Sequence, residues 1–305
     1  MITPKQAVDA INERFGSHDG DRALHARGVL CTGTFAATPQ AAALSRAAHL
    51  RGEPVPVTVR FSNGSGDPGE PDSVPDVRGM ATKFYLPDGS RTDIVAQTAP
   101  RFPVRTPDAF IAFVRAMAPG PGQLVRLPLF LARHPEAVAA LPANVAAIKP
   151  PVSYATSRYY AIHSFRWLDE GGGARWVRYR WMPEAGVASL SRKEAKSRGR
   201  EYLQEELRER LSRASVRFVL EVQIARDGDP VHDPTSPWRD DRETVEAGTL
   251  ELTGLDTERE KDGDVLVFDP VRVVDGIELS DDPILRFRPD AYAESVQRRS
   301  GATRD

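Results

Sequence analysis

The chain has 305 residues, enough for one large domain or two smaller ones. Its 41 basic and 43 acidic residues are interleaved and give a net charge of -2, so it lacks the charge excess of a nucleic-acid-binding protein. The single cysteine, Cys31, excludes an intrachain disulfide framework and fits a reducing compartment. We see no apolar signal segment and no run of about 20 apolar residues, so we expect a cytoplasmic protein without a membrane span.

The N-terminal third of the sequence predicts one helix followed by three strands. Residues 3–15 predict a short helix, because Thr3 suits the N-cap, a proline follows it and apolar residues recur at helical spacing. Alternating patterns predict strands at 55–62, 79–86 and 93–97, and a Pro-Asp-Gly turn joins the last two.

The predicted strand at 55–62 carries polar residues on one of its two faces. Arg60 and Ser62 point to the face opposite Val59 and Phe61. Such a face either meets solvent or lines a polar cavity, and the pattern alone leaves both interpretations open.

The rest of the chain predicts a hairpin, a long strand and three helices. Two strand-like stretches, 159–168 and 175–182, flank three consecutive glycines, which is typical of a hairpin. Residues 216–224 alternate as another strand. The predicted helices are 107–117, 127–141 and 192–213. Because strands follow one another without helices between them, we expect antiparallel pairing and an α+β fold.

An arginine and a tyrosine near the C-terminus have helical spacing. Arg288 and Tyr292 are four apart, and Pro289 suits the first position of a helix, so both would lie on one side of it. A neighbouring guanidinium favours the phenolate form of a tyrosine, and tyrosinate is a known ligand of haem iron. An ordinary Arg–Tyr surface pair has the same spacing, so this pattern also leaves two interpretations open.

Five segments, taken in order, resemble the haem catalase family over most of the chain. They are RALHARG at 22–28, VTVRFSNGSGDPGEPDSVPDVRGMATKFYLPDG at 57–89, TDIVAQTAPRFPVRTPDAF at 92–110, YYAIHSFRW at 159–167 and FDPVRVVDGIELSDDPILRFRPDAYAESVQRR at 268–299. The chain is shorter than a typical catalase and resembles the small catalase-related peroxidases. The resemblance implies a single domain over 1–305, built as a closed antiparallel β-barrel with surrounding helices and haem b beside it.

The resemblance also implies roles for four residues. Tyr292 matches the proximal tyrosinate that ligates the haem iron, and Arg288 matches the arginine that keeps it ionised. His25 matches the distal acid–base residue, which would move a proton between the two oxygens of a peroxide. Ser62 matches the hydroxyl that orients this histidine.

Five more residues match positions around the haem. Arg22, Arg60 and Arg299 match arginines near the propionates, because charge-assisted pairs hold carboxylates well. Phe102 and Phe110 match aromatic residues against the distal haem face, although a place in the ordinary apolar core explains them nearly as well.

Three positions depart from the family pattern. Gln97 stands where the family has its distal asparagine, and the extra methylene moves the amide by about 1.5 Å, enough to impair catalysis. Leu24 replaces a valine that narrows the channel, and Val296 stands where catalases often have a histidine. These departures favour peroxidase turnover over fast dismutation of hydrogen peroxide, which needs a second peroxide aligned on the same groups.

We therefore expect a haem peroxidase that reduces hydrogen peroxide or organic hydroperoxides with a small-molecule reductant, with weak catalase activity at most. We expect a homodimer, because the shortened chain leaves the core exposed. The alternatives are a true catalase and a haem-binding protein without turnover. A third alternative, the allene oxide synthase branch of the superfamily, places Thr before the distal histidine, where this chain has Leu24.

Two other histidines have no metal-ligand pattern. His163 and His232 lack a second ligand at the spacing that metal sites use, so we expect structural roles for both.

Overall fold

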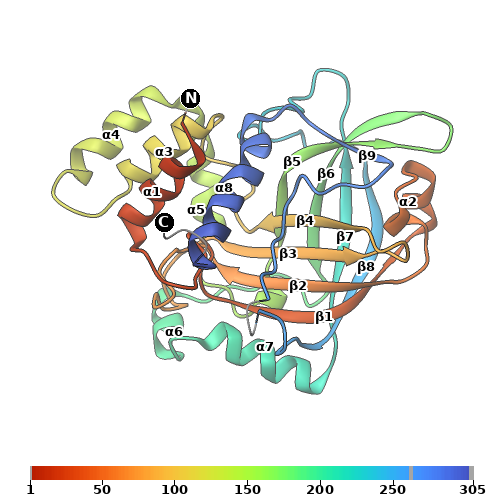
Figure 1. The fold of residues 1–305 in the computed structure, drawn as a ribbon, viewed down its shortest axis with the longest axis horizontal. Helices are drawn as coiled ribbons and strands as arrows, with labels where there is room; N and C mark the ends of the chain where they lie inside the picture. The colour runs from red at the N-terminus through yellow and green to blue at the C-terminus, as the bar shows by residue number, and fades with distance from the viewer. Residues whose placement is uncertain (1, 261–263, 302–305) are drawn as a thin grey trace.

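Eight antiparallel strands, β1 to β8, form a closed barrel at the centre of the molecule (Figure 1). Strands that are neighbours in the chain are neighbours in the sheet, and the circle closes where β1 pairs with β8 and β4 with β5. A short ninth strand, β9, pairs with β5. The computed structural model describes residues 2–260 and 264–301. The α+β class and the closed antiparallel barrel are confirmed.

The strands are β1 Gly28–Ala37, β2 Val55–Asn63, β3 Arg78–Tyr85, β4 Arg91–Gln97, β5 Tyr159–Leu168, β6 Ala174–Pro183, β7 Val216–Ile224, β8 Thr244–Leu255 and β9 Ile277–Leu279. The helices are α1 Pro4–Phe15, α2 Pro39–Leu44, α3 Pro107–Ala116, α4 Gln123–Arg133, α5 Pro135–Ala147, α6 Arg192–Ser197, α7 Tyr202–Arg213 and α8 Pro283–Arg299. Two short 3-10 turns lie at Ala48–Leu50 and Tyr154–Thr156.

Two of the predicted helices are each two helices in the structure. The predicted helix at 127–141 is divided between α4 and α5, because His134 has a non-helical backbone and Pro135 starts a new helix there. The predicted helix at 192–213 is divided between α6 and α7, since Arg198 is already extended. The predicted helix at 3–15 is confirmed as α1, and Thr3 and Gln6 form its capping box.

The last helix begins earlier than its proline suggested. Asp282 caps α8 by accepting from the backbone N–H groups of Ile284 and Leu285, and Pro283 takes the first helical position. Pro289 therefore lies inside α8 and does not open it. Figure 1 shows α8 running beside the barrel, near α1 and α3, which it contacts.

Both faces of β2 are buried, which decides between the two interpretations of its polar side. Val59 and Phe61 point into the barrel and join its apolar core. Arg60 and Ser62 point outward, yet they are 6% and 4% exposed, because other segments cover this side of the barrel. The outer face of β2 is therefore a covered polar surface and not a solvent-facing one.

A buried ion pair fastens one covering segment to the outer side of β3 and β4. Nζ of Lys83 donates to both carboxylate oxygens of Asp93, at 2.6 and 2.8 Å. The backbone N–H of Asp269 donates to the same carboxylate at 2.9 Å. This places the chain before β9 across the barrel, next to the outer face of β2. Within 2–260 and 264–301, no helix is long and apolar enough to cross a membrane.

Candidate functional site

His25 lies in the segment that enters β1, in a backbone conformation that its neighbours hold. Its φ angle is 57°, in the left-handed region that residues other than glycine rarely adopt. The backbone N–H of His25 donates to the carbonyl of Gly64 at 3.2 Å. The Arg60 guanidinium donates to the carbonyl of His25 at 2.9 Å and to that of Ala26 at 3.0 Å. Contacts on both sides of the backbone thus fix the direction of the imidazole.

The imidazole of His25 lies against the outer face of the barrel. Its Nδ1 is hydrogen-bonded to Oγ of Ser62 at 3.0 Å, as the resemblance implied. Ser62 is paired with Gly79 across β2 and β3. A Cβ atom at Gly79 would lie 2.9 Å from Nδ1 of His25 and 2.6 Å from Oγ of Ser62, so glycine is needed there. Nε2 of His25 forms no hydrogen bond to another described residue.

The surroundings of His25 keep its imidazole neutral. Burial, together with the positive charges of three arginines, lowers the pKa of His25 to about 3. The three are Arg60, Arg288 and Arg22, in decreasing order of effect, and the backbone of Asn63 acts in the opposite direction. A neutral imidazole with a free nitrogen can accept a proton from a bound substrate.

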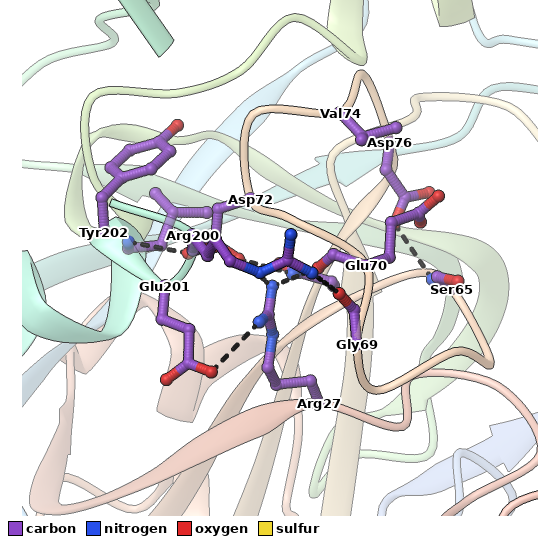
Figure 2. A network of polar contacts seen from close by, with 12 residues as sticks. Arg27, Ser65, Gly69, Glu70, Asp72, Val74, Asp76, Arg200, Glu201 and Tyr202 are labelled. Atoms are coloured by element: carbon purple, nitrogen blue, oxygen red, sulfur yellow. Dashed lines mark hydrogen bonds and ion pairs between the residues drawn. The ribbon is translucent and has the colours of Figure 1, made fainter. Parts of the chain in front are cut away.

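Arg27, two residues after His25, ties the same segment to distant parts of the chain (Figure 2). Its Nη2 donates to Oδ1 of the fully buried Asp72 at 2.7 Å, and its Nη1 donates to Glu201 at 3.4 Å. The backbone N–H of Leu203, in the first turn of α7, donates to the other oxygen of Asp72 at 2.9 Å. The His25 segment is therefore anchored to the β2–β3 loop and to α7.

A chain of four side chains ends at the hydroxyl of Tyr292. Oδ2 of Asp282 is bonded to Nδ1 of His163 at 2.6 Å. Nε2 of His163 is bonded to Nη1 of Arg288 at 2.9 Å, and Nε of Arg288 donates to the Tyr292 oxygen at 2.7 Å. The predicted Arg288–Tyr292 contact therefore exists, and His163 and Asp282 extend it into the barrel wall.

The donors in this chain fix the protonation of His163. A guanidinium only donates, so Nε2 of His163 must accept from Arg288. Burial lowers the pKa of His163, which keeps the ring neutral with its one proton on Nδ1, facing Asp282. His163 thus holds Arg288 through Nη1, and Nε–H of Arg288 points to the Tyr292 oxygen.

Two arginines predicted near the haem propionates, Arg22 and Arg299, lie close together. Both Arg22 and Arg299 donate to the carbonyl of Leu266, at 2.8 and 3.4 Å. Arg22 also donates to Glu260 at 3.2 Å. The third, Arg60, has its Nε 3.9 Å from the same Glu260 carboxylate. The structure therefore brings together the three arginines that the sequence comparison selected.

The arginines of this cluster lie close enough for their positive charges to affect one another's pKa. Burial lowers the pKa of Arg60 to about 9, and the charge of Arg22 adds to this effect. Burial lowers the pKa of Arg299 to about 10, again with Arg22 contributing. Glu260 raises both values but does not restore them. Such a cluster favours additional anionic groups, such as carboxylates.

Gln97 lies on the same outer face as Ser62. It is paired with Gly79, which is in turn paired with Ser62, so the three residues form a row across β2, β3 and β4. Its amide nitrogen donates to the carbonyl of Ala99 at 3.2 Å. One amide proton of Gln97 is therefore held by the chain's own backbone.

Phe102 and Phe110 contact each other beside α3. Their ring centroids are 5.2 Å apart, and both rings pack against a small apolar cluster that contains Val104 and Phe130. Phe110 also packs against the cluster under α1 that includes Phe287 of α8. These contacts make the two rings part of a helical side core, and their predicted haem contact stays a prediction.

Sequence reasoning missed His163, Asp282 and Glu260 as parts of the site. Asp282 is 119 residues from His163 and Glu260 is 238 residues from Arg22, and no local pattern marks either pairing. His232, by contrast, accepts from the backbone of Asp281 at 3.0 Å, as a structural residue would. Over 2–260 and 264–301 there is no cluster of three or more His, Cys, Asp or Glu side chains arranged to hold a metal ion.

Comparison with known proteins gives a consistent family assignment. The family model for catalase matches residues 10–304. A catalase-related peroxidase from Mycolicibacterium paratuberculosis is 49% identical over 303 residues, which cover 99% of this chain and 96% of the relative. A catalase-related peroxidase from Synechococcus elongatus is 31% identical over 303 residues, covering 98% of this chain and 89% of the relative.

The fold agrees with this assignment. The crystal structure of a fungal catalase superposes with a TM-score of 0.83 at 23% identity and covers 93% of this chain. This chain covers 60% of that catalase, which fits the shorter length inferred from the sequence. With a family model over nearly every residue and a relative at 49% identity, the chain belongs to the catalase family.

Proposed function

We propose that this protein is a haem-dependent peroxidase that reduces hydrogen peroxide or organic hydroperoxides with a small electron donor. Membership of the catalase family makes it an oxidoreductase that acts on peroxide. The observation that carries the finer proposal is the neutral His25, with a free Nε2, held on Ser62 and close enough to Arg288 for that charge to lower its pKa.

The described side chains fit a haem group with two propionates. The guanidinium groups of Arg22, Arg60 and Arg299 lie close together beside Leu266 and Glu260, and the two propionate carboxylates would form charge-assisted pairs with them. Tyr292 offers an oxygen with a guanidinium donor on one side, a suitable axial ligand for iron. When bound, haem b would supply the redox chemistry that no side chain of this protein provides.

His25 would move one proton during turnover. Its Nε2 would accept the proton from one oxygen of a bound hydroperoxide and give it to the other oxygen, which leaves as water or an alcohol when the O–O bond breaks. The two electrons for this cleavage would come from bound haem, and the donor would later replace them. Ser62 holds Nδ1 at 3.0 Å, so the ring cannot rotate away during the transfer. Burial keeps the ring neutral before the substrate arrives.

Gln97 supports peroxidase turnover over fast dismutation. Dismutation needs a second hydrogen peroxide held by the same distal groups, whereas a peroxidase needs only electrons from a reductant. One amide proton of Gln97 is bonded to Ala99, and the longer side chain changes where the amide lies.

The remaining proposals concern the state of the protein. We propose one domain over 1–305, because the catalase family model spans 10–304. We propose a cytoplasmic protein, because Cys31 is a buried free thiol and no disulfide is needed. The homodimer stays a proposal, and its subunit contacts are left to experiment.

A peroxide panel tests the proposed function. The haem-loaded protein is mixed in turn with hydrogen peroxide, cumene hydroperoxide and peracetic acid, with and without a phenolic donor. Peroxide consumption, donor oxidation and oxygen release are followed. We expect donor-dependent consumption of all three and little oxygen from hydrogen peroxide.

Two results would count against this proposal. Rapid oxygen release without a donor would identify a true catalase. A Soret band that never responds to any peroxide would identify a haem-binding protein without turnover.

A further inference from the structure

The outer faces of α4 and α5 expose large apolar side chains. Among the described residues, eight large hydrophobic side chains are exposed, and six of them lie on these two consecutive helices. The six are Leu124, Val125, Leu129, Val138, Leu141 and Val145, which we call the α4–α5 face. Leu124 is 85% exposed and Val125 is 68% exposed. Monomeric soluble proteins rarely leave so many large apolar side chains exposed together, and such a surface is typical of an interaction site.

The exposed side chains of α4 form one stripe along the helix. Leu124 is followed one turn later by Pro128, and Val125 by Leu129, so these residues share a side of the helix. The opposite side carries Phe130, which is buried against the α3 side core. The helix is therefore apolar on both its inner and its outer side. Figure 1 shows α4 at one end of the molecule, away from the barrel.

The exposed side of α5 is apolar throughout. Its outward positions include Val138, Leu141 and Val145, whereas Ala137 and Ala140 face inward and are buried. The four charged residues between 118 and 150 are Arg126, Arg133, Glu136 and Lys149. Glu136 is bonded to His134 at 3.1 Å, so the one acidic side chain already has a local partner. Basic residues therefore border an apolar surface that has no exposed carboxylate of its own.

The positions of the two arginines on α4 fit a membrane surface. Arg126 and Arg133 are seven residues apart, so they lie on the same side of the helix, at one border of the apolar stripe. Long basic side chains at such a border reach the headgroups while the apolar side chains enter the acyl boundary.

We propose that the α4–α5 face docks on the surface of an anionic phospholipid bilayer. The apolar side chains would enter the interface, and Arg126, Arg133 and Lys149 would contact the acidic headgroups. A second copy of this chain fits less well, because it would bring the same three basic residues and no exposed carboxylate to pair with them. This inference concerns binding alone and holds whether or not the peroxidase proposal is correct.

Vesicle flotation with the full-length haem-loaded protein tests the docking. One set of vesicles contains phosphatidylcholine alone. The other contains phosphatidylcholine with about 30 mol% phosphatidylserine, which gives a clearly negative surface. We expect the native protein to float with the anionic vesicles and much less with the neutral ones. Replacing each arginine with Gln, in R126Q and R133Q, should weaken partitioning by about fivefold per charge.

Two triple variants separate the apolar contribution from general effects. Leu124→Ser, Val125→Ser and Leu129→Ser together should abolish flotation, because they remove the stripe without touching the inner side of α4. Exposed residues elsewhere supply the matched controls. Val187→Ser, Arg213→Gln and Arg239→Gln remove one exposed apolar and two exposed basic side chains outside this face and should leave flotation unchanged.

Three outcomes would overturn the docking proposal. The first is a native protein that does not float with anionic vesicles, and the second is an α4 triple variant that floats like the native protein. The third is a native dimer that the α4 triple variant converts to a monomer, without any vesicle binding, which would assign the face to a second copy. Normal haem uptake and circular dichroism in each variant show that the fold is retained, and the peroxide panel reports separately on the proposed function.

Discussion

At the scale of single residues, the candidate site depends on glycines that leave room for neighbouring side chains as well as on the side chains themselves. The His25 imidazole lies so close to Gly79 that a Cβ atom there would clash with it, so this position requires glycine. Gly28, at the start of β1, has the same relation to Arg60, whose Cζ atom would lie 2.6 Å from a Cβ atom there. Both glycines therefore leave the space that the His25 and Arg60 side chains occupy.

The substitution Gly79→Ala should displace His25 while leaving the barrel folded. The added methyl would come within 2.9 Å of Nδ1 of His25 and 2.6 Å of the Ser62 hydroxyl. We expect the reaction of the haem-loaded protein with peroxide to slow by about 100-fold, the usual effect of a displacement near 1 Å. Stopped-flow absorbance measures the rate.

Gly254→Ala is the matched control, since a Cβ atom at Gly254 of β8 meets only the Thr32 hydroxyl, at 3.9 Å. It should keep the native rate. Equal rates in the two variants would contradict the position assigned to His25.

Residues of the site were predictable where a motif marks them and hidden where only the fold does. His25, Ser62, Arg288 and Tyr292 lie in segments whose order resembles a known family, and their hydrogen bonds exist as expected. Asp282 belongs to the site only because it contacts His163, where β5 and the start of α8 lie side by side in the folded chain. No residue spacing in the sequence predicts this contact.

At the scale of elements, the strands marked by clear alternation or by a glycine-rich hairpin turn were predictable, and β1, β8 and β9 were not. β2 and β7 alternate apolar and polar residues along their length, and their bounds were predicted to within a residue. β1 contains two glycines and β8 contains two, which obscure the pattern, so both were missed. The breaks within the two long predicted helices depend on single backbone positions, such as His134.

Asp282 joins the start of α8 to the buried His163 and should be important for stability. Oδ1 accepts from the backbone of Ile284 and Oδ2 is bonded to His163, so Asp282→Asn must turn an amide N–H toward one of these donors. We expect a loss of about 2 kcal/mol in the free energy of unfolding, typical of a buried hydrogen bond to a charged group. Urea denaturation of the full-length protein provides the measurement.

Asp281→Asn is the neighbouring control, because the Asp281 side chain is 84% exposed and pairs with Arg286 at 3.3 Å on the surface. It should change the free energy of unfolding by less than about 0.5 kcal/mol. A similar loss in both variants would show that Asp282 has no special role at the start of α8.

At the scale of the whole molecule, the barrel gathers into one place groups that the chain keeps far apart. The proposed distal side would come from the segment before β1 and from β2, β3 and β4. The proposed proximal side would come from β5 and α8. Closure of the sheet between β4 and β5 sets these sides at fixed positions, and the buried Lys83–Asp93 pair holds the covering segment.

Acid should destabilise the folded molecule partly through its buried histidines. Burial lowers the pKa of His49 to about 4, and its Nδ1 has no partner among the described residues. In the unfolded chain this histidine binds a proton near pH 6.5, so the unfolded state gains protons first as the pH falls from about 6.5 to 4. Stability is full above that window and falls by about 3 kcal/mol across it.

The substitution His49→Phe should remove this part of the acid sensitivity. The ring packs beside Phe84 at 5.0 Å, so a phenyl group fits the site. We expect the variant and the native protein to differ less in stability at pH 8 than at pH 4.5, where the variant should be the more stable. Thermal unfolding at the two pH values makes the comparison, and an unchanged pH dependence would argue against a neutral buried His49.

The most direct test of the account is the rate at which the haem-loaded His25→Ala variant reacts with peroxide. Stopped-flow absorbance at the Soret band would follow mixing with peracetic acid and with cumene hydroperoxide, with His232→Ala as the control. If His25 transfers the proton, the rate should fall by about 100- to 10,000-fold, the range for loss of a general acid–base group, and the control should keep the native rate. A His25→Ala variant that reacts as fast as the native protein would contradict the role assigned to His25.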